Sequence, residues 1–493
     1  MSTFGLLKTV LPLAVVALLA PSAVAWNNGD IGKLPPMGFN TWNRFQCNIN
    51  EQLIHDTAQQ MKDKGFLDAG YKFINLDDCW LEKNRSADGH LVSDAKKFPS
   101  GLKNLTQYLK GLGFKAGIYE DQGTLTCANY PGSLDHELTD ARDFVDWGFE
   151  YAKIDNCWHE PWKGTDQDRF KRWTDALTQV HQETGVWMYY SFVEWQSFDA
   201  YVWGKDIANT YRMYDDIQPE WSSIATILNN ASFIGDRTNF WARSDLGMHP
   251  FNALKIVRLP SPLDMLENGN GQLTLAEQRS HFTAWALAKS PLLIGTDFSK
   301  LSAESAEILL NKEIIAINQD NVIGEPLKPF FWGKNPDKTW DPKYPAQYWS
   351  GYHVKDGKQH TVIMYINVNE QPVHLNFTLS RSPHLNGDKT YDVYDLWKHE
   401  IVGQAKGFYF ADNIDTHDVR AYLFSEAAPS APPSSTPPTS YPPPSSTPPP
   451  SYTPPPSYTP PSSYGPPPLS TPPSYGAPPS YGQPPSYGAP PSY

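Results

Sequence analysis

The run Tyr151-Ala152-Lys153-Ile154-Asp155-Asn156-Cys157 decides the fold of this chain. Its Tyr, Ala and Ile residues are typical of a short buried strand. Charged side chains in a buried strand are usually paired or functional, because burying an unpaired charge costs free energy. Asp155 lies at the carboxyl end of this strand, where a (β/α)₈ barrel carries its chemistry. Taken alone, the run fits equally a structural Lys153–Asp155 pair and a catalytic carboxylate.

Short apolar segments of this kind alternate with amphipathic helical segments over residues 27–325. The predicted strands are Met37–Phe39, Tyr71–Leu76, Lys115–Tyr119, Tyr151–Ile154, Val186–Ser191, Ala208–Tyr211 and Pro291–Gly295. The predicted helices include Asn50–Lys64, Gly101–Leu112, Asp135–Trp147 and Asp166–Thr184. Strand–helix alternation over about 300 residues predicts a parallel sheet closed into a barrel. We therefore expect a catalytic (β/α)₈ barrel over residues 26–325.

Polar residues follow most of the predicted strands: Asn40, Asp77, Asp78, Glu120, Asp121, Asp155 and Glu194. The carboxyl ends of parallel strands meet at one edge, so these side chains should gather there. A doubly wound nucleotide-binding sheet would instead need a glycine-rich turn after its first strand. Gly38-Phe39-Asn40 supplies no such turn. We expect no cofactor.

The pattern changes after Pro326, where short alternating strands are separated by turn signals. The predicted strands are Thr361–Asn367, Val373–Leu379, Thr390–Asp395 and Val419–Phe424. This pattern predicts an antiparallel β-sandwich over residues 326–426.

Residues 427–493 contain no charged residue and consist almost entirely of Pro, Ser, Thr, Tyr and Gly. Such a composition cannot bury a core, so we expect a disordered, extended, polyproline-like tail. The tail fits either a passive spacer or a segment that contacts the cell wall or a polysaccharide.

Residues 1–25 resemble a secretory signal peptide, with an apolar run and the cleavage site Ala23-Val24-Ala25. We expect a secreted, extracellular protein without a membrane span. The net charge of −13 argues against nucleic acid as a partner. The N-x-S/T sequons predict N-glycosylation at Asn84, Asn104, Asn230 and Asn376.

The chain has four cysteines, Cys47, Cys79, Cys127 and Cys157. Their even number and their confinement to one stretch predict two disulfides, for which the residues alone allow three pairings. No C-x-x-C spacing occurs. We therefore expect no zinc site and no other metal site.

Two carboxylates that face each other across a pocket can hydrolyse a glycoside. Asp155 is one candidate, and Lys153 lies two residues earlier on the same strand face. The second candidate lies in the segment Arg212-Met213-Tyr214-Asp215-Asp216-Ile217. By itself, an R-x-x-D-D segment is most often a solvated turn with a salt bridge.

Several segments together resemble glycoside hydrolase family 27, in the α-galactosidase clan. They are Leu34–Asn43, Asn75–Trp80, Gly117–Tyr119, Pro131–His136, Lys153–Cys157, Asp264–Gly271 and His281–Gly295. The likeness covers about residues 30–425, and its motifs occur in the order that the family has. The resemblance implies a barrel followed by a sandwich, and a fungal-type secreted enzyme.

The resemblance implies that Asp155 is the nucleophile and Asp216 the acid/base of a retaining mechanism. The two carboxyl groups should then lie roughly 5–5.5 Å apart. It also implies the disulfides Cys47–Cys79 and Cys127–Cys157. The second disulfide would form part of the pocket wall beside the nucleophile.

The resemblance also implies the residues that bind the sugar. Asp77 and Asp78 should accept hydrogen bonds from the 4- and 6-hydroxyls, although a helix N-cap would also explain this pair. Glu194 favours galactose over N-acetylgalactosamine. The other implied contacts are an apolar wall from Trp42, donors from Tyr119, Lys153 and Arg212, and an Asp264 contact with the 2-hydroxyl.

The sequence departs from the family at residues 247–263, which interrupt the motif that ends in Asp264-Met265. This segment is either a retained short intron or a real insertion at the pocket rim. If it is translated, we expect it to displace Asp264 and lower activity. Asp215 is a second departure, and like-charge repulsion from it should raise the pKa of Asp216.

These inferences predict a secreted enzyme that removes terminal α-D-galactosyl residues from oligosaccharides or galactomannan. The alternatives within the clan are a β-L-arabinopyranosidase and an α-N-acetylgalactosaminidase. A third alternative is a wall-associated structural protein with an inactive barrel, which the presence of both Asp155 and Asp216 disfavours.

Overall fold

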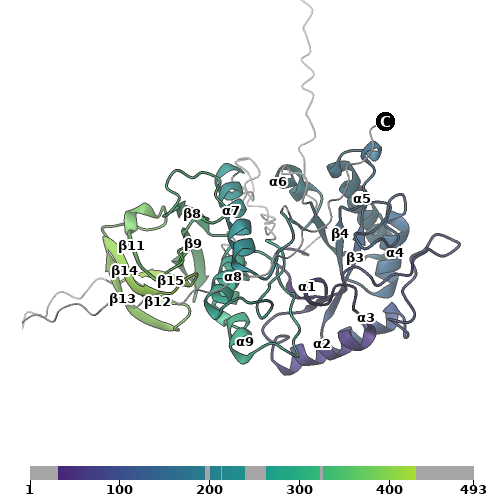
Figure 1. Cartoon of the computed structure of the whole chain (residues 1–493), viewed down its shortest axis with the longest axis horizontal. Coiled ribbons are helices and arrows are strands. Elements are labelled where there is room, and N and C mark those ends of the chain that lie inside the picture. The colour runs from purple at the N-terminus through teal and green to yellow at the C-terminus, as the bar shows by residue number, and fades with distance from the viewer. Residues whose placement is uncertain (1–30, 195–199, 213, 239–262, 323–325, 429–493) are drawn as a thin grey trace, which may run out of the picture. The chain divides into compact units, whose positions relative to one another are not determined.

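The computed structural model describes residues 31–194, 200–212, 214–238, 263–322 and 326–428 (Figure 1). The predicted signal peptide lies outside this part of the chain. Nearly all of the predicted tail and residues 247–262 of the unusual segment also lie outside it.

The N-terminal part contains a parallel sheet of seven described strands in the order β6-β5-β4-β3-β2-β1-β7. The strands are β1 (Met37–Asn40), β2 (Phe73–Asn75), β3 (Lys115–Asp121), β4 (Tyr151–Asp155), β5 (Tyr189–Val193), β6 (Thr210–Arg212) and β7 (Leu292–Ile294). Leu266 forms a further parallel bridge with Ile294 and occupies the place of an eighth strand. The barrel predicted from strand–helix alternation is thus confirmed.

Side chains of β4 alternate between the barrel interior and the surrounding helices. Tyr151 stacks on Tyr189 inside the sheet, with ring centroids 4.9 Å apart. Ala152 and Ile154 instead belong to the large apolar cluster shared with the helices. Because side chains alternate along a strand, Asp155 points to the same side as Tyr151. The period of the strand therefore aims the aspartate into the mouth of the barrel.

Helices connect the strands and cover the outside of the sheet (Figure 1). They are α1 (Trp42–Phe45), α2 (Glu51–Asp63), α3 (Leu102–Leu112), α4 (Glu137–Trp147), α5 (Asp166–Thr184), α6 (Ala200–Trp203), α7 (Trp221–Thr238), α8 (Leu275–Leu287), α9 (Ala303–Leu309) and α10 (Lys312–Asn318). Helix α5 has the predicted bounds because local signals fix both ends. Thr165 and Asp168 form a capping box at its start, and Gly185 adopts a left-handed conformation at its end.

Arg212 links the two ends of the described barrel sheet. Its Nη1 lies 3.2 Å from Oδ2 of Asp264, just before the Leu266 bridge. The backbone N–H of Ile217 donates to the same oxygen at 2.9 Å. Polar contacts at the mouth therefore join β6 to the segment that follows residues 239–262.

The C-terminal part is an antiparallel sheet in the order β11-β14-β13-β12-β15-β10-β9-β8. Its strands are β8 (Lys328–Phe331), β9 (Tyr348–Lys355), β10 (Lys358–Ile366), β11 (Val373–Thr378), β12 (Thr390–Asp395), β13 (Glu400–Lys406), β14 (Phe408–Ile414) and β15 (Val419–Glu426). Phe330 and Phe377 come from the two outermost strands, yet their ring centroids are 6.0 Å apart. The sheet therefore folds over one aromatic core, as the predicted sandwich requires.

Helix α8 packs the barrel against this sandwich. Arg279 pairs with Asp418 at 3.0 Å, and Ser280 donates to the carbonyl of His417. Apolar residues of the barrel helices and of β10 and β15 belong to one buried cluster. The sandwich thus packs against one side of the barrel through shared apolar contacts.

Gly38 allows β1 and β2 to pair closely. A Cβ at Gly38 would lie 2.2 Å from the carbonyl oxygen of Phe73. We predict that Gly38→Ala lowers the free energy of unfolding by about 1–3 kcal/mol, because overpacking forces the backbone apart. Gly111→Ala is the matched control: Gly111 lies in α3 with open space around it, so alanine should stabilise by about 0.5–1 kcal/mol. Denaturation midpoints that move equally in both variants would contradict this account.

Candidate active site

One cavity opens at the carboxyl ends of the barrel strands. Its lining includes nine of the residues that the sequence singled out: Trp42, Asp77, Asp78, Tyr119, Lys153, Asp155, Arg212, Asp216 and Asp264. Residues from β3, β4 and β6 and from the loops after them thus converge as predicted for a barrel. Asn43, Cys127 and Glu267 also line the cavity.

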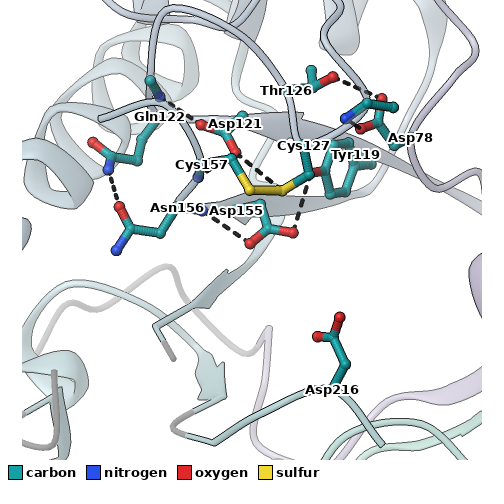
Figure 2. Close-up of a disulfide and its surroundings, with 12 residues drawn as sticks. Asp78, Tyr119, Asp121, Gln122, Thr126, Cys127, Asp155, Asn156, Cys157 and Asp216 are labelled. Carbon is teal, nitrogen blue, oxygen red and sulfur yellow. Dashed lines mark hydrogen bonds between the residues drawn. A yellow bond between two sulfur atoms is a disulfide. The ribbon is translucent and has the colours of Figure 1, made fainter. Parts of the chain in front are cut away.

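Asp155 ends β4 and is held by two donors (Figure 2). The Tyr119 hydroxyl donates to Oδ2 at 3.1 Å, and the Asn156 backbone N–H donates to Oδ1 at 2.9 Å. Burial raises the pKa of Asp155, while the charges of Lys153 and Arg212 oppose that rise. The carboxylate is therefore oriented by fixed donors and kept close to two cations.

Asp216 approaches the cavity from the segment after β6 (Figure 2). Its side chain is 63 % exposed and accepts a hydrogen bond from Arg212. Partial desolvation beside the cavity wall acts to raise the pKa of Asp216, but the charges of Arg212 and Lys153 outweigh this effect, and the pKa is lowered. The expectation that Asp215 raises this pKa is therefore wrong, because Arg212 dominates the surroundings of the carboxylate.

Lys153 pairs with Asp77 rather than with Asp155. Its Nζ lies 2.7 Å from Oδ2 of Asp77, which also accepts from Nδ2 of Asn40 at 2.7 Å. Burial lowers the pKa of Lys153, but the charges of Asp77 and Asp155 more than compensate and raise it to about 12. The lysine thus remains charged and links the ends of β4 and β2, which lie on either side of β3.

Asp78 is buried and accepts three hydrogen bonds. Its donors are the backbone N–H groups of Cys79 at 2.6 Å and Ala128 at 2.9 Å, and the Thr126 hydroxyl at 3.0 Å. Burial still raises its pKa to about 6. The described residues 79–101 contain no helix, so the alternative that Asp77 and Asp78 cap a helix is wrong.

Both disulfides implied by the family resemblance are present, as Cys47–Cys79 and Cys127–Cys157. Cys157 is two residues from Asp155, so its disulfide ties the end of β4 to the loop that holds Cys127 (Figure 2). The two sulfur atoms lie within 4.8 Å of carboxylate oxygens of Asp121 and Asp155. The sulfurs are bonded to each other and are not thiolates, so this group offers a metal only two carboxylates.

Asp121 is a neighbour of Asp155 to which sequence reasoning gave no role. It pairs with Asp155 in the register of β3 and β4. Its carboxylate accepts the backbone N–H of Cys157 at 2.8 Å and that of Gly123 at 2.7 Å. Burial and the charge of Asp155 raise its pKa well above its ordinary value. The sequence signal that could have pointed to Asp121 as a site residue was its position just after a predicted strand.

Glu267 and Asn43 form a second pair that sequence reasoning missed. Asn43 donates to one carboxylate oxygen of Glu267, and Asn270 donates to the other at 2.5 Å. Burial raises the pKa of Glu267 to about 7, with a further contribution from Asp264. The family motif that begins at Asp264 contains Glu267, but a glutamate in a loop gives no sign of burial.

Asp264 lies in the cavity wall, bonded to Arg212 and to Ile217. The expected displacement by the preceding segment is therefore absent from the described structure. Its φ of 79° is unusual for a residue other than glycine. Leu263, the last residue of the segment, is buried, and its N–H donates to Ser290 at 2.9 Å.

Glu194 is buried behind the wall of the cavity. Its Oε2 accepts from Nδ2 of Asn156 at 2.8 Å, and it is not among the described residues that line the cavity. It thus orients the residue next to Asp155. The preference for galactose inferred from Glu194 therefore stays a prediction.

The four sequons differ in exposure. Asn84, Asn104 and Asn376 are exposed. Asn230 lies within α7 and is only 9 % exposed, which leaves no room for a glycan on the folded chain. The glycosylation predicted at Asn230 is therefore not supported.

The family model for α-galactosidase A matches residues 34–320, more than half of the chain. The chain belongs to this family. A second family model, the C-terminal β-sandwich domain of α-galactosidase, matches residues 343–424. This member of the α-galactosidase family is therefore a glycoside hydrolase with a barrel and a sandwich.

Known proteins share this organisation over most of their length. "Alpha-galactosidase 2" of Arabidopsis thaliana is 40 % identical over 78 % of this chain and 88 % of its own. "Probable alpha-galactosidase B" of Penicillium simplicissimum is 36 % identical over 85 % and 99 %. The solved structure of the α-galactosidase from Saccharomyces cerevisiae with raffinose has a TM-score of 0.69 and 29 % identity, over 83 % of this chain and 100 % of its own.

Within the described residues, no helix has the length and apolar character needed to cross a bilayer.

Glu267 should make stability depend on pH. Its folded-state pKa of about 7 lies above the ordinary 4.5, so the folded state holds a proton that the unfolded state releases. The corresponding stability is complete below about pH 4.5 and is lost as the pH rises through about 7. Glu267→Gln cannot ionise, so its melting temperature should fall less than that of the wild type between about pH 5 and 7.5.

The control for this comparison is Glu400→Gln, which changes an exposed glutamate on β13. It should retain the wild-type pH dependence. Parallel curves for the wild type and Glu267→Gln would contradict the buried, proton-holding carboxyl group.

Proposed function

We propose that the chain is a retaining exo-α-galactosidase that releases terminal α-D-galactosyl residues from oligosaccharides and galactomannan. The observation that carries the proposal is the cavity in which Asp155 and Asp216 face a shared space walled by paired charges. Glycosidases use two carboxylates in this kind of arrangement as their catalytic groups. The activities named for the relatives support the same substrate class.

Asp155 is the proposed nucleophile. Tyr119 and Asn156 hold its two oxygens, so the carboxylate needs little reorientation before it attacks the anomeric carbon. The charges of Lys153 and Arg212 favour its ionised form against the effect of burial. Attack forms a galactosyl ester and breaks the bond to the leaving oxygen.

Asp216 is the proposed acid/base. Its exposed carboxylate is ionised before a sugar binds, because Arg212 lowers its pKa. A bound sugar would cover this carboxylate, and desolvation raises the pKa of a carboxyl group. Binding thus favours the protonated form that donates to the leaving oxygen. After the leaving group departs, ionised Asp216 can accept a proton from the attacking water.

We assign the recognition of galactose to Asp77, Asp78 and Trp42. An axial 4-hydroxyl needs a well-placed acceptor, and Asp77 is fixed by Lys153 and Asn40. The side chain of Trp42 supplies the apolar part of the wall. Glu194 enters this proposal only through Asn156, as a positioning residue. A β-L-arabinopyranosidase would instead prefer substrates without the 6-hydroxymethyl group.

Secretion belongs to the same proposal, since it rests on the sequence of residues 1–25. The tail of residues 427–493 is the proposed contact with wall or polysaccharide.

Substituting the two carboxylates should give different losses. Asp155→Asn removes the nucleophile, so activity should vanish on every α-galactoside. Asp216→Asn removes the acid, so hydrolysis of raffinose should fall by about 10²–10⁴-fold. On an activated nitrophenyl α-galactoside, whose leaving group needs no proton, the loss in bond cleavage should be much smaller. Steady-state and pre-steady-state rates on both substrates test this.

Asp215→Asn is the matched control, because Asp215 is exposed, adjacent in sequence and outside the cavity lining. It should retain activity near that of the wild type. Equal losses in Asp215→Asn and Asp216→Asn, or full activity in Asp155→Asn, would overturn the assignment.

A further inference from the structure

One edge of the sandwich presents large apolar side chains to solvent. Phe408 and Phe410 on β14 are 65 % and 52 % exposed, and Ile401 on β13 is 64 % exposed. We call Phe408 and Phe410 the aromatic face. Contiguous exposed apolar surface on a folded protein can mark a binding site.

The neighbouring strand carries a glycosylation sequon on the same side. In Asn376-Phe377-Thr378 of β11, Asn376 and Thr378 are exposed, whereas Phe377 is buried. The strand register places Asn376 opposite Phe410 and Thr378 opposite Phe408. Directly opposed residues share a face, with Cβ atoms about 4.5–5.5 Å apart. The acceptor asparagine therefore stands beside the aromatic face.

The ring of His374 extends this surface. It stacks on Phe410 with ring centroids 5.7 Å apart and an interplanar angle of 25°. His374 lies two residues before Asn376 on β11, so their side chains point the same way. The asparagine is thus flanked by flat rings, onto which the apolar face of a sugar can pack.

We propose that Asn376 bears an N-linked glycan whose first N-acetylglucosamine lies on Phe410 and shields the aromatic face. In the reaction that attaches it, Nδ2 of Asn376 bonds to the anomeric carbon of a lipid-diphosphate-linked oligosaccharide. The bond from that carbon to the diphosphate oxygen breaks, the lipid diphosphate leaves, and the amide gives up one proton. The proposal rests on passage through the secretory pathway and is independent of which sugar the barrel hydrolyses.

Asn376 differs from the sequon at Asn230 in exposure, and its place beside Phe410 gives a glycan a surface on which to pack. Asn230 is buried and can carry no glycan on the folded chain. At Asn376, the attachment atom and its apolar neighbours belong to two hydrogen-bonded strands. A glycan attached there cannot leave the vicinity of Phe410, so its packing requires no separate binding step.

The test uses the full chain secreted from a glycosylating host. Glycopeptide mass spectrometry should find Asn376 occupied. Hydroxyl-radical footprinting then compares three forms: the intact glycoprotein, the protein trimmed to a single N-acetylglucosamine, and Asn376→Gln. The oxidation rate of Phe410 should be equally low in the first two forms and several-fold higher in the third.

Thr378→Val provides a second variant, since it removes the sequon but keeps the asparagine. It should expose Phe410 as Asn376→Gln does. Trp162 is the internal control: it is 78 % exposed, and its oxidation rate should be the same in every form. An unoccupied Asn376, or a Phe410 oxidation rate that ignores the glycan, would overturn the proposal and leave the face to a polysaccharide or a second copy. Activity on galactosides should be unchanged throughout, which separates this test from that of the proposed function.

Discussion

The buried ion pair between Lys153 and Asp77 is the constraint on which the site depends. The cavity gathers acidic groups from several strands, whereas the described residues of its lining include just two cations, Lys153 and Arg212. An unpaired charge at this depth would destabilise the fold. Lys153 joins the ends of β4 and β2, and Arg212 joins the ends of the barrel sheet. The two cations thus hold the strand ends together. Their positive charges also act to lower the pKa values of Asp155 and Asp216.

The excess of acid over base explains the other features of the site. Backbone N–H groups donate to the carboxylates of Asp78 and Asp121 and stabilise them. Burial still raises the pKa of both groups, and at Glu267, where amide side chains are the donors, it raises the pKa to about 7. The disulfide Cys127–Cys157 fixes the loop that supplies several of these donors. The acidic groups around Asp155 are therefore stabilised by hydrogen-bond donors at fixed positions as well as by cations.

The sequence predicted the fold where local signals were strong. Helix α5 has caps at both ends, and β12 alternates cleanly, so both were predicted with their observed bounds. Strand β13 was missed because nearly all of its residues are exposed, so no buried face produces a period. Asp155 was a candidate from its place at a strand end and Asp216 from the R-x-x-D-D segment, and the family resemblance gave them and Asp264 their roles. Asp121 and the position of Glu194 depend on strand register and burial. Neither can be read from the order of residues alone.

The central claim is that Asp155 forms a covalent bond to galactose. A 5-fluoro-α-galactosyl fluoride should form the galactosyl ester quickly and release it slowly. Digestion and mass spectrometry should then locate the fluorogalactosyl group on the peptide that contains Asp155, and no labelled peptide should appear in Asp155→Asn. A label on another carboxylate, or steady turnover without any labelled enzyme, would contradict the account.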